Sequence, residues 1–138
     1  LQVATVKHAH HDFDIDKEGT DSWRHRKAGA SEVAILSDRR WAIMHELGQE
    51  PEPTLAQIMD RLSPCDLVLV EGFKREQHKK IEVRRTEGRK GDALSRQDAM
   101  IVAVAADHPV EGESVPVYDL DDVSGIADLI LRECGLAS

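Results

Sequence analysis

The sequence predicts an α/β fold with a mostly parallel, doubly wound sheet. Two runs of apolar residues, 67–70 and 100–105, are uninterrupted, which is typical of parallel strands that are buried on both faces. Apolar residues at helical spacing accompany both runs, and this alternation of strand and helix indicates βαβ units. Hydrophobic residues make up 41% of the chain and aromatic ones only 4%, so the core has to be mostly aliphatic, as in parallel sheets under helices.

The first part of the chain supplies a strand, a loop and a helix. Residues 2–7 read as a short strand, and the polar residues 8–19 as a loop. Thr20 can cap a helix over about residues 21–28, because its side-chain oxygen can accept a hydrogen bond from the first turn. Gly29 then ends this helix.

A β-hairpin and a second helix follow. The apolar runs 32–36 and 41–45 are separated by four polar residues, and we expect Trp41 to anchor this hairpin. Thr54 then caps a helix that Pro64 stops. The apolar stripe of this helix is formed by Leu55, Ile58, Met59 and Leu62.

The second half of the chain contains further strands and a closing helix. Alternating apolar and polar residues predict a half-exposed strand at 80–85, and the run 100–105 predicts a buried one. Val115 and Val117 indicate a short last strand. The apolar stripe of the final helix is formed by Val123, Ile126, Ala127, Ile130, Leu131 and Cys134.

Length and composition indicate one domain over residues 1–138 and argue against two classes of protein. The net charge of −8 argues against broad nucleic-acid binding, which needs a basic face, whereas a single nucleotide needs only a local positive site. No apolar stretch approaches the ~20 residues of a membrane span, and no secretory signal is visible. Cys65 and Cys134 are isolated, so we interpret both as reduced core residues of a cytoplasmic protein.

The acid that ends the run 67–70 is the first candidate for function. In open α/β sheets ligands bind beyond the carboxyl ends of the strands, so Glu71 would lie where a carboxylate can hold a metal ion or orient a water. Gly72 lets the backbone turn sharply there. The alternative, an acid that leaves a strand into solvent, has about equal support. We expect Lys7, Asp21 and Glu71 to converge at one rim of the sheet.

The loop over residues 7–16 is rich in His and Asp and has several interpretations. The segment does not match the template of a calcium-binding loop, because Lys17 stands where the template needs a glycine. A zinc site made of its histidines would lack nearby cysteine ligands. The open alternatives are a solvated loop and a phosphate- and substrate-binding loop, in which Lys7 and the histidines donate hydrogen bonds.

Three further segments have both a structural and a functional interpretation. Residues 16–22 combine an acid, a turn glycine and a helix start, which attracts anions but is also what a plain capped helix needs. The basic segment 74–90 is either a solvated loop or a surface that binds phosphate or docks a partner. Asp107 is either a loop acid or a carboxylate that pairs with the ring N–H and amino group of a guanine.

Several short motifs occur together in a fixed order. They are Val-Lys-His-x-His-His at 6–11, Asp-x-x-Gly-Thr-Asp-Ser at 16–22, Arg24, Ala-Gly-Ala at 28–30 and Leu-Val-Leu-Val-Glu-Gly-Phe-Lys at 67–74. In this order, with the hairpin between them, they resemble the MobB family of molybdopterin-guanine dinucleotide biosynthesis proteins, from residue 2 to the last helix. The resemblance implies a three-layer P-loop NTPase-like fold with an inserted β-hairpin, binding of GTP and Mg²⁺, weak GTPase activity and a homodimer.

The resemblance also assigns roles to single residues by their position in the motifs. Glu71 resembles the acid of the second nucleotide-binding motif, which contacts magnesium directly or through water. Asp16 and Asp21 are similar to family acids near the γ-phosphate and the metal, so Glu71 and Asp21 are the implied catalytic residues and all three are implied metal ligands. The implied nucleotide contacts are Lys7, His8 and His11 in the loop that faces the ligand and, by weaker matching, Asp107 as the guanine reader.

One family feature is absent from the sequence. The family has a phosphate-binding loop, G-x-x-x-x-G-K-[ST], after its first strand, and no glycines of this sequence have that spacing. Residue 2 coincides with the second strand of the family, so we expect that about 30 upstream residues, one strand-loop-helix unit, are missing. The chain as given is therefore expected to bind GTP poorly.

The resemblance leaves the function open between three hypotheses. The first is a GTP-binding, weakly hydrolysing accessory protein that helps a MobA-like molybdopterin guanylyltransferase to attach GMP to molybdopterin. The second is a non-catalytic adaptor that docks molybdopterin and its transferase through the segment 74–90 and the hairpin. The third is another P-loop biosynthetic enzyme of the dethiobiotin synthetase type. No nucleic-acid or membrane partner is expected.

Overall fold

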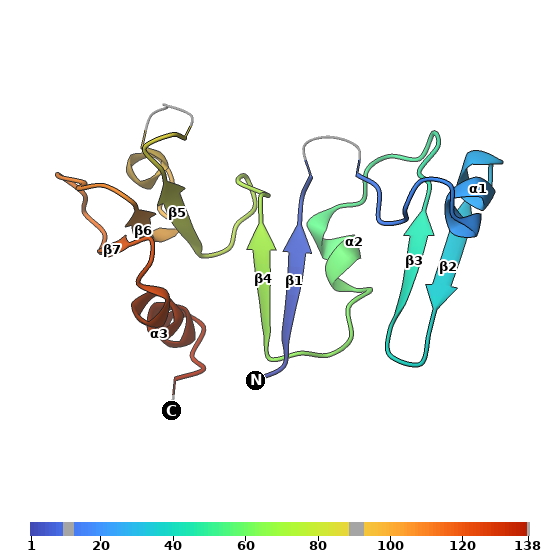
Figure 1. Ribbon diagram of the computed structural model, residues 1–138. Coiled ribbons are helices and arrows are strands. Elements are labelled where there is room, and N and C mark those ends of the chain that lie inside the picture. Colours follow the sequence, from blue (N-terminus) through green and yellow to red (C-terminus); the bar gives the residue numbers. More distant parts are fainter. Residues whose placement is uncertain (10–12, 89–92, 138) are drawn as a thin grey trace. The chain divides into compact units, whose positions relative to one another are not determined.

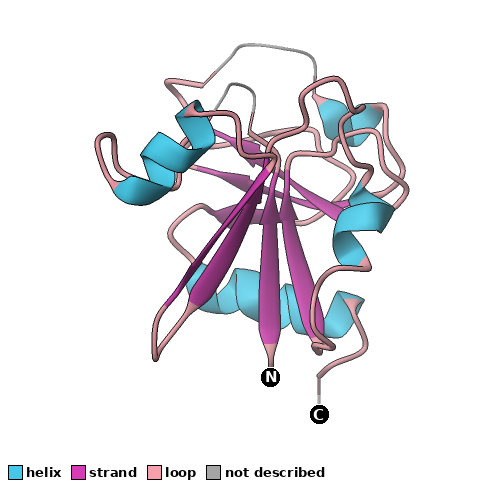
Figure 2. Cartoon of the chain, turned by 90° about the vertical axis from the view of Figure 1, so that its right-hand side faces the viewer, coloured by secondary structure: helices cyan, strands magenta, loops and turns pink. Residues whose placement is uncertain are grey.

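The computed structural model describes residues 1–9, 13–88 and 93–137, and it divides into two compact units, Leu1–Phe73 and Lys74–Ser138. Helices and strands follow one another along the chain, which confirms the predicted α/β class (Figure 2). Among the described residues, no helix combines the length and the apolar character that crossing a membrane requires. The single domain over residues 1–138 stays a prediction.

A parallel pair of strands forms the first sheet of the first unit (Figure 1). β1 (Val3–Lys7) and β4 (Leu67–Glu71), both predicted as strands, run side by side in a register that places Lys7 opposite Glu71. The expectation that residues 67–70 are buried on both faces is wrong, because Leu69 is 41% exposed. Within the described residues this sheet has two strands, too few to form the wide, doubly covered sheet in which such a run is buried.

The predicted hairpin is confirmed at the predicted residues. β2 (Glu32–Leu36) and β3 (Trp41–His45) pair in antiparallel fashion, and the helix α1 (Asp21–Lys27) packs against β2. Trp41 does not anchor the hairpin as expected, because it is 73% exposed. Side chains alternate between the two faces of a hairpin, and the opposed residues Val33 and Met44 are the ones that are buried.

Both helices of the first unit begin where the sequence predicts. α1 (Asp21–Lys27) starts after Thr20, but the Thr20 hydroxyl donates to the carbonyl of Lys17 at 2.7 Å and makes no capping bond to the helix. α2 (Leu55–Met59) does have its predicted cap, because Thr54 forms a full capping box. This helix ends earlier than its predicted stripe.

The second unit contains a three-stranded parallel sheet in the order β5-β6-β7. Its strands, all of them predicted, are β5 (Lys80–Arg84), β6 (Ile101–Ala106) and β7 (Val117–Asp119), and the predicted helix α3 (Val123–Glu133) follows. A short 3₁₀ helix, η1 (Leu94–Arg96), was not predicted. Because β6 lies in the middle, both of its edges are paired.

The core of the second unit is aliphatic, as the composition predicts. Its buried residues are Ile101, Ala103, Val104, Ala105 and Ala106 of β6 and Leu129 of α3.

The predicted stripe of α3 is wrong at three positions: Val123 is 73% exposed, and Ala127 and Cys134 are exposed as well. Val123 begins the helix and Cys134 follows its last residue, where less of the unit surrounds them. Leu129, which the predicted stripe does not include, is the buried residue of this helix. Cys134 is exposed and Cys65 is only half-buried, so neither is the core residue that we expected, although both are free thiols as predicted.

Candidate functional site

Two oppositely charged side chains end the neighbouring strands β1 and β4. The parallel register brings the last residues of both strands together, and Lys7 Nζ lies 3.3 Å from Glu71 Oε1. Both side chains are largely exposed, so they are accessible to a ligand. We call Lys7, His8, Glu71, Gly72 and Phe73 the β1–β4 rim. Two of the three side chains that were expected to converge here do so.

His8 is held against the turn that follows β4. Its backbone N–H donates to the carbonyl of Glu71 at 2.9 Å, and its ring lies 4.9 Å from the ring of Phe73. Gly72 has a φ of +95°, which confirms the predicted sharp turn, and a Cβ at this position would stand 2.8 Å from His8 Cβ. The glycine therefore allows the turn to close on His8.

Glu52 joins the rim from a distant part of the sequence. Its Oε1 lies 2.6 Å from His8 Nε2. Sequence reasoning missed this residue, although it stands between Pro51 and Pro53, which restrict the backbone and favour an extended segment. A charged residue between two prolines is a signal that could have identified it.

Asp16 lies in a different environment, against a guanidinium. Arg26 donates to Asp16 Oδ1 at 2.8 Å and to Asp14 Oδ1 at 2.7 Å, and its Nε lies 3.7 Å from Glu46 Oε1. The hydrogen bond to Asp16 raises the pKa of Arg26, burial opposes this, and the charge of Asp14 adds to the increase. The side chain of Asp16 is 1% exposed, and its Oδ2 is buried without a hydrogen-bond partner among the described residues.

Asp21 is the first residue of α1 and is exposed. None of the contacts found among the described residues joins it to Lys7 or Glu71, so its place at the rim stays a prediction. His11 lies outside the described residues.

The described residues contain no group of three or more His, Cys, Asp or Glu side chains arranged to hold a metal ion. Asp16 already shares the guanidinium of Arg26 with Asp14, and Glu71 already pairs with Lys7. Mg²⁺, however, usually keeps several waters and binds one or two carboxylates together with substrate phosphates. An exposed Glu71 fits that mode as a single protein ligand, while the assignment of Asp16 and Asp21 stays a prediction.

Asp107, the expected guanine reader, belongs to the second unit and follows β6. Its Oδ1 accepts hydrogen bonds from Thr86 N at 2.8 Å and Thr86 Oγ1 at 3.0 Å, and His108 Nδ1 lies 2.8 Å from the same oxygen. The contact with His108 lowers the pKa of Asp107, burial opposes this, and the bonds from Thr86 lower the pKa further. The carboxylate is thus held ionised, and a guanine would have to share it with these partners.

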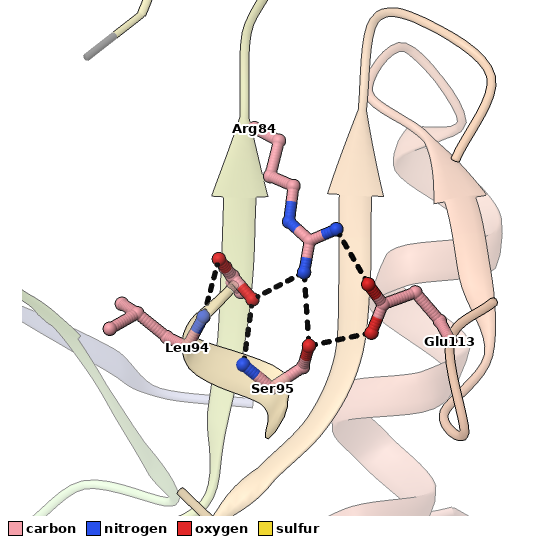
Figure 3. A network of polar contacts seen from close by, with 5 residues as sticks. Arg84, Leu94, Ser95 and Glu113 are labelled. Atoms are coloured by element: carbon pink, nitrogen blue, oxygen red, sulfur yellow. Dashed lines mark hydrogen bonds and ion pairs between the residues drawn. The ribbon is translucent and has the colours of Figure 1, made fainter. Parts of the chain in front are cut away.

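A polar network that the sequence did not reveal lies at the end of β5 (Figure 3). Arg84 donates to Glu82 Oε2 and to Glu113 Oε1, both at 2.8 Å, and to Ser95 Oγ at 2.9 Å. The Ser95 hydroxyl donates to Glu113 Oε2 at 2.6 Å, and the N–H groups of Leu94 and Ser95 donate to Glu82. The network fixes η1 and the segment around Glu113 on β5.

Hydrogen bonds set the charge states in this network. The hydrogen bond from Arg84 to Glu82 has the largest effect in raising the pKa of Arg84, and the bond to Glu113 raises it further. The bond from Arg84 lowers the pKa of Glu113. For Glu82, burial is the largest single influence and acts to raise its pKa, but the bonds from Arg84, Ser95 and Leu94 together outweigh it and lower the pKa.

The chain matches known sequences over most of its length. A family model described as "MobB: Molybdopterin guanine dinucleotide synthesis protein B" matches residues 1–107. The Molybdopterin-guanine dinucleotide biosynthesis adapter protein of Haemophilus influenzae is 43% identical over 134 residues, which cover 94% of this chain and 71% of that protein. The protein of the same name from Escherichia coli (strain K12) is 42% identical over 135 residues, which cover 96% of this chain and 76% of that protein.

Solved structures agree with these matches. A crystal structure of molybdopterin-guanine biosynthesis protein B (mobB) is 30% identical and superposes with a TM-score of 0.70, covering 96% of this chain and 80% of the other. The MobB protein homolog from Bacillus stearothermophilus is 29% identical, with a TM-score of 0.66 and coverage of 99% and 79%. The chain therefore belongs to the MobB family of molybdopterin-guanine dinucleotide biosynthesis adapter proteins, as its motifs predicted.

Proposed function

We propose that this chain is a cytoplasmic adapter that helps a MobA-like guanylyltransferase to attach GMP to molybdopterin. The name of its relatives supports this role, and so does an exposed apolar surface on the hairpin. Leu36 lies opposite Trp41, with Ile43 on the same face, and all three are exposed. We call them the outer hairpin face. Exposed apolar patches mark interaction sites, so we assign the transferase to this face.

Replacement of Trp41 by Ser is expected to weaken binding of the transferase about 30-fold, because truncation of a central aromatic residue at an interface costs about 2 kcal/mol. Isothermal titration calorimetry with the purified transferase measures this loss. Val123→Ser is the matched control, since Val123 is equally exposed but lies in the other unit. Unchanged transferase affinity would show that the hairpin does not dock this partner.

The same variant separates the two candidate occupants of the outer hairpin face. We also propose a homodimer, and a second copy of the chain is the alternative occupant of this surface if the transferase does not bind there. Light scattering of Trp41→Ser shows which one binds there. A loss of the dimer with intact transferase binding assigns the face to the second copy.

We propose GTP binding with Mg²⁺ and weak hydrolysis as a second function, supported by the β1–β4 rim. Lys7 would leave Glu71 to donate to a phosphate, and Glu71 would contact the ion directly or through water, as in other phosphoryl-transfer sites. The bound ion would neutralise charge on the phosphates. Asp21 and Asp16 would lie near the γ-phosphate and the ion. The further nucleotide contacts proposed are His8, His11 and Asp107.

We propose that the fold is three-layer and P-loop NTPase-like and that the β1–β4 rim is its nucleotide edge. Among the residues that the structure describes, no arginine or glutamine is found in contact with Lys7 or Glu71, which fits a slow rate of hydrolysis. Because the sequence has no phosphate-binding loop, we expect the 138-residue chain alone to bind GTP poorly.

Replacement of Glu71 by Gln is expected to lower GTP hydrolysis by about 100-fold, because the group that holds charge at the phosphates is lost. Hydrolysis is followed by phosphate release, and cofactor maturation by the activity of a molybdoenzyme in the same cells. Glu76→Gln removes an exposed acid that follows the rim in the sequence but belongs to the second unit, and it serves as the control. Loss of hydrolysis with normal cofactor maturation would show that maturation does not need hydrolysis and would support the adapter role alone.

A further inference from the structure

A histidine at the end of the hairpin contacts two carboxylates. His45 closes β3 opposite Glu32 of β2. Its Nδ1 lies 2.9 Å from Glu32 Oε1, and its Nε2 lies 3.2 Å from Glu50 Oε2. An ionised carboxylate only accepts hydrogen bonds, so both ring nitrogens have to donate. The ring that makes both contacts is therefore the charged imidazolium.

The charges around this ring all favour its protonated form. Hydrogen bonds with Glu32 and then Glu50 raise the pKa of His45, and burial opposes this. Glu46, the next residue, faces Arg26 of α1 at 3.7 Å. Among the described residues, no cation is found in contact with the ring. Because both carboxylates are largely exposed, salt will screen these contacts.

Glu50 belongs to a segment that connects two distant parts of the first unit. Its own N–H donates to the carbonyl of Leu47 at 2.7 Å, which closes the turn after β3. Two residues later, Glu52 contacts His8 at the β1–β4 rim. Residues 46–53 are thus attached to the hairpin at one end and to the rim at the other.

We propose that His45 is a pH-operated latch, which holds Glu50 and the segment 46–53 on the hairpin when protonated and releases them when it loses its proton to solvent. The proposal depends on neither GTP binding nor the adapter role. His45 and Glu32 lie on the same face of the hairpin as Trp41, at its other end. Opening of the latch therefore alters the edge of the outer hairpin face and the support of Glu52 at the rim.

The sign of the pH dependence follows from the raised pKa. His45 has a higher pKa in the folded state than its ordinary value of 6.5. Its contacts with the two carboxylates therefore contribute fully to stability below pH 6.5. The contribution is lost as the pH rises through the folded-state pKa, which lies above 6.5. The latch is closed in mildly acidic solution and opens toward alkaline pH.

NMR titration of the His45 ring in the full chain tests the first half of the proposal. The midpoint is expected above 6.5 and is expected to fall in Glu50→Gln and in Glu32→Gln, because each variant removes one of the two charges. A wild-type midpoint at or below the ordinary value overturns the proposal. So does a midpoint that neither glutamine variant changes.

The order of the turn after β3 tests the second half of the proposal, the release of the segment 46–53. Heteronuclear NOEs of the amides of residues 47–50 are expected to be high about two pH units below the His45 midpoint and to fall about two units above it. In His45→Gln they are expected to be low at both pH values, whereas the matched variant His25→Gln, changed in α1, retains the wild-type response. Equal order in the wild-type chain at both pH values, or an unaltered response in His45→Gln, overturns the latch. Glu50→Gln supplies the same comparison where His45→Gln does not fold.

Discussion

Replacement of Arg84 by Met is expected to destabilise the second unit by about 3–5 kcal/mol at neutral pH. The side chains of Glu113 and Glu82 are only 3% and 9% exposed, and Arg84 donates to both. Without the guanidinium, the negative charges of two buried carboxylates would have no positive partner in the network. Urea denaturation measures the loss as a lower midpoint at unchanged slope.

Two control variants separate the network from a general effect of lost charge. Arg85→Met removes the next arginine, which is exposed, and is expected to change the free energy of unfolding by about 0.5 kcal/mol or less. Arg84→Lys keeps the charge but loses the planar fork that reaches two carboxylates, so we expect an intermediate loss. If Arg84→Met were as mild as Arg85→Met, the network would have no part in the stability of this unit.

The cost of Arg84→Met is also expected to depend on pH. The pKa values of Glu82 and Glu113 lie below the ordinary value of 4.5 in the folded wild-type chain. Their stabilising contribution is therefore complete above 4.5 and is lost as the pH falls through the lower folded-state pKa values. Denaturation curves of both chains should converge in acid, and a difference that stays constant down to acidic pH would contradict this account.

The hairpin and the positions of the strands along the chain were predictable because they depend on local patterns. Two apolar runs around a polar tetrapeptide specify β2 and β3 to the residue, and the uninterrupted run at β6 specifies a buried strand. The end of α2 was less predictable. The bonds of Arg61 to Ile58 and of Leu62 to Met59 span only three residues, so the helix tightens and ends before the proline at 64.

Burial and side-chain pairing were not predictable from local patterns. Which face of the hairpin is covered depends on the packing of α1, so the pattern could not show that Trp41 is exposed. The contacts of Arg26 with Asp16 and of Glu52 with His8 span 10 and 44 residues and depend on the paths of loops. Lys7 and Glu71 were predictable because parallel neighbours bring their strand ends together.

Replacement of Gly72 by Ala is expected to destabilise the first unit by about 2–5 kcal/mol, from two sources. The left-handed φ of +95° costs an L-residue about 1–2 kcal/mol. The added Cβ would stand 2.8 Å from His8 Cβ, and overpacking of this kind costs about 1–3 kcal/mol. Urea denaturation of the variant and wild-type chains measures the sum.

Gly29→Ala separates the two sources. Gly29 has a φ of +99°, but nothing lies within 4 Å of a Cβ there, so this variant carries the backbone strain without the clash. The excess cost of Gly72→Ala over Gly29→Ala therefore measures the contact with His8. Equal costs would mean that the backbone of His8 yields without penalty.

The identity of the clashing atoms allows a sharper test by double substitution. The atoms nearest to the added Cβ include His8 Cβ and Cα, so His8→Ala keeps the clash and is not expected to rescue Gly72→Ala. His8→Gly removes the Cβ and is expected to recover part of the loss, which gives a coupling energy in a double-mutant cycle. Rescue by His8→Ala as well would assign the conflict to the imidazole and to its contacts with Phe73 and Glu52, rather than to the close approach of the two backbones.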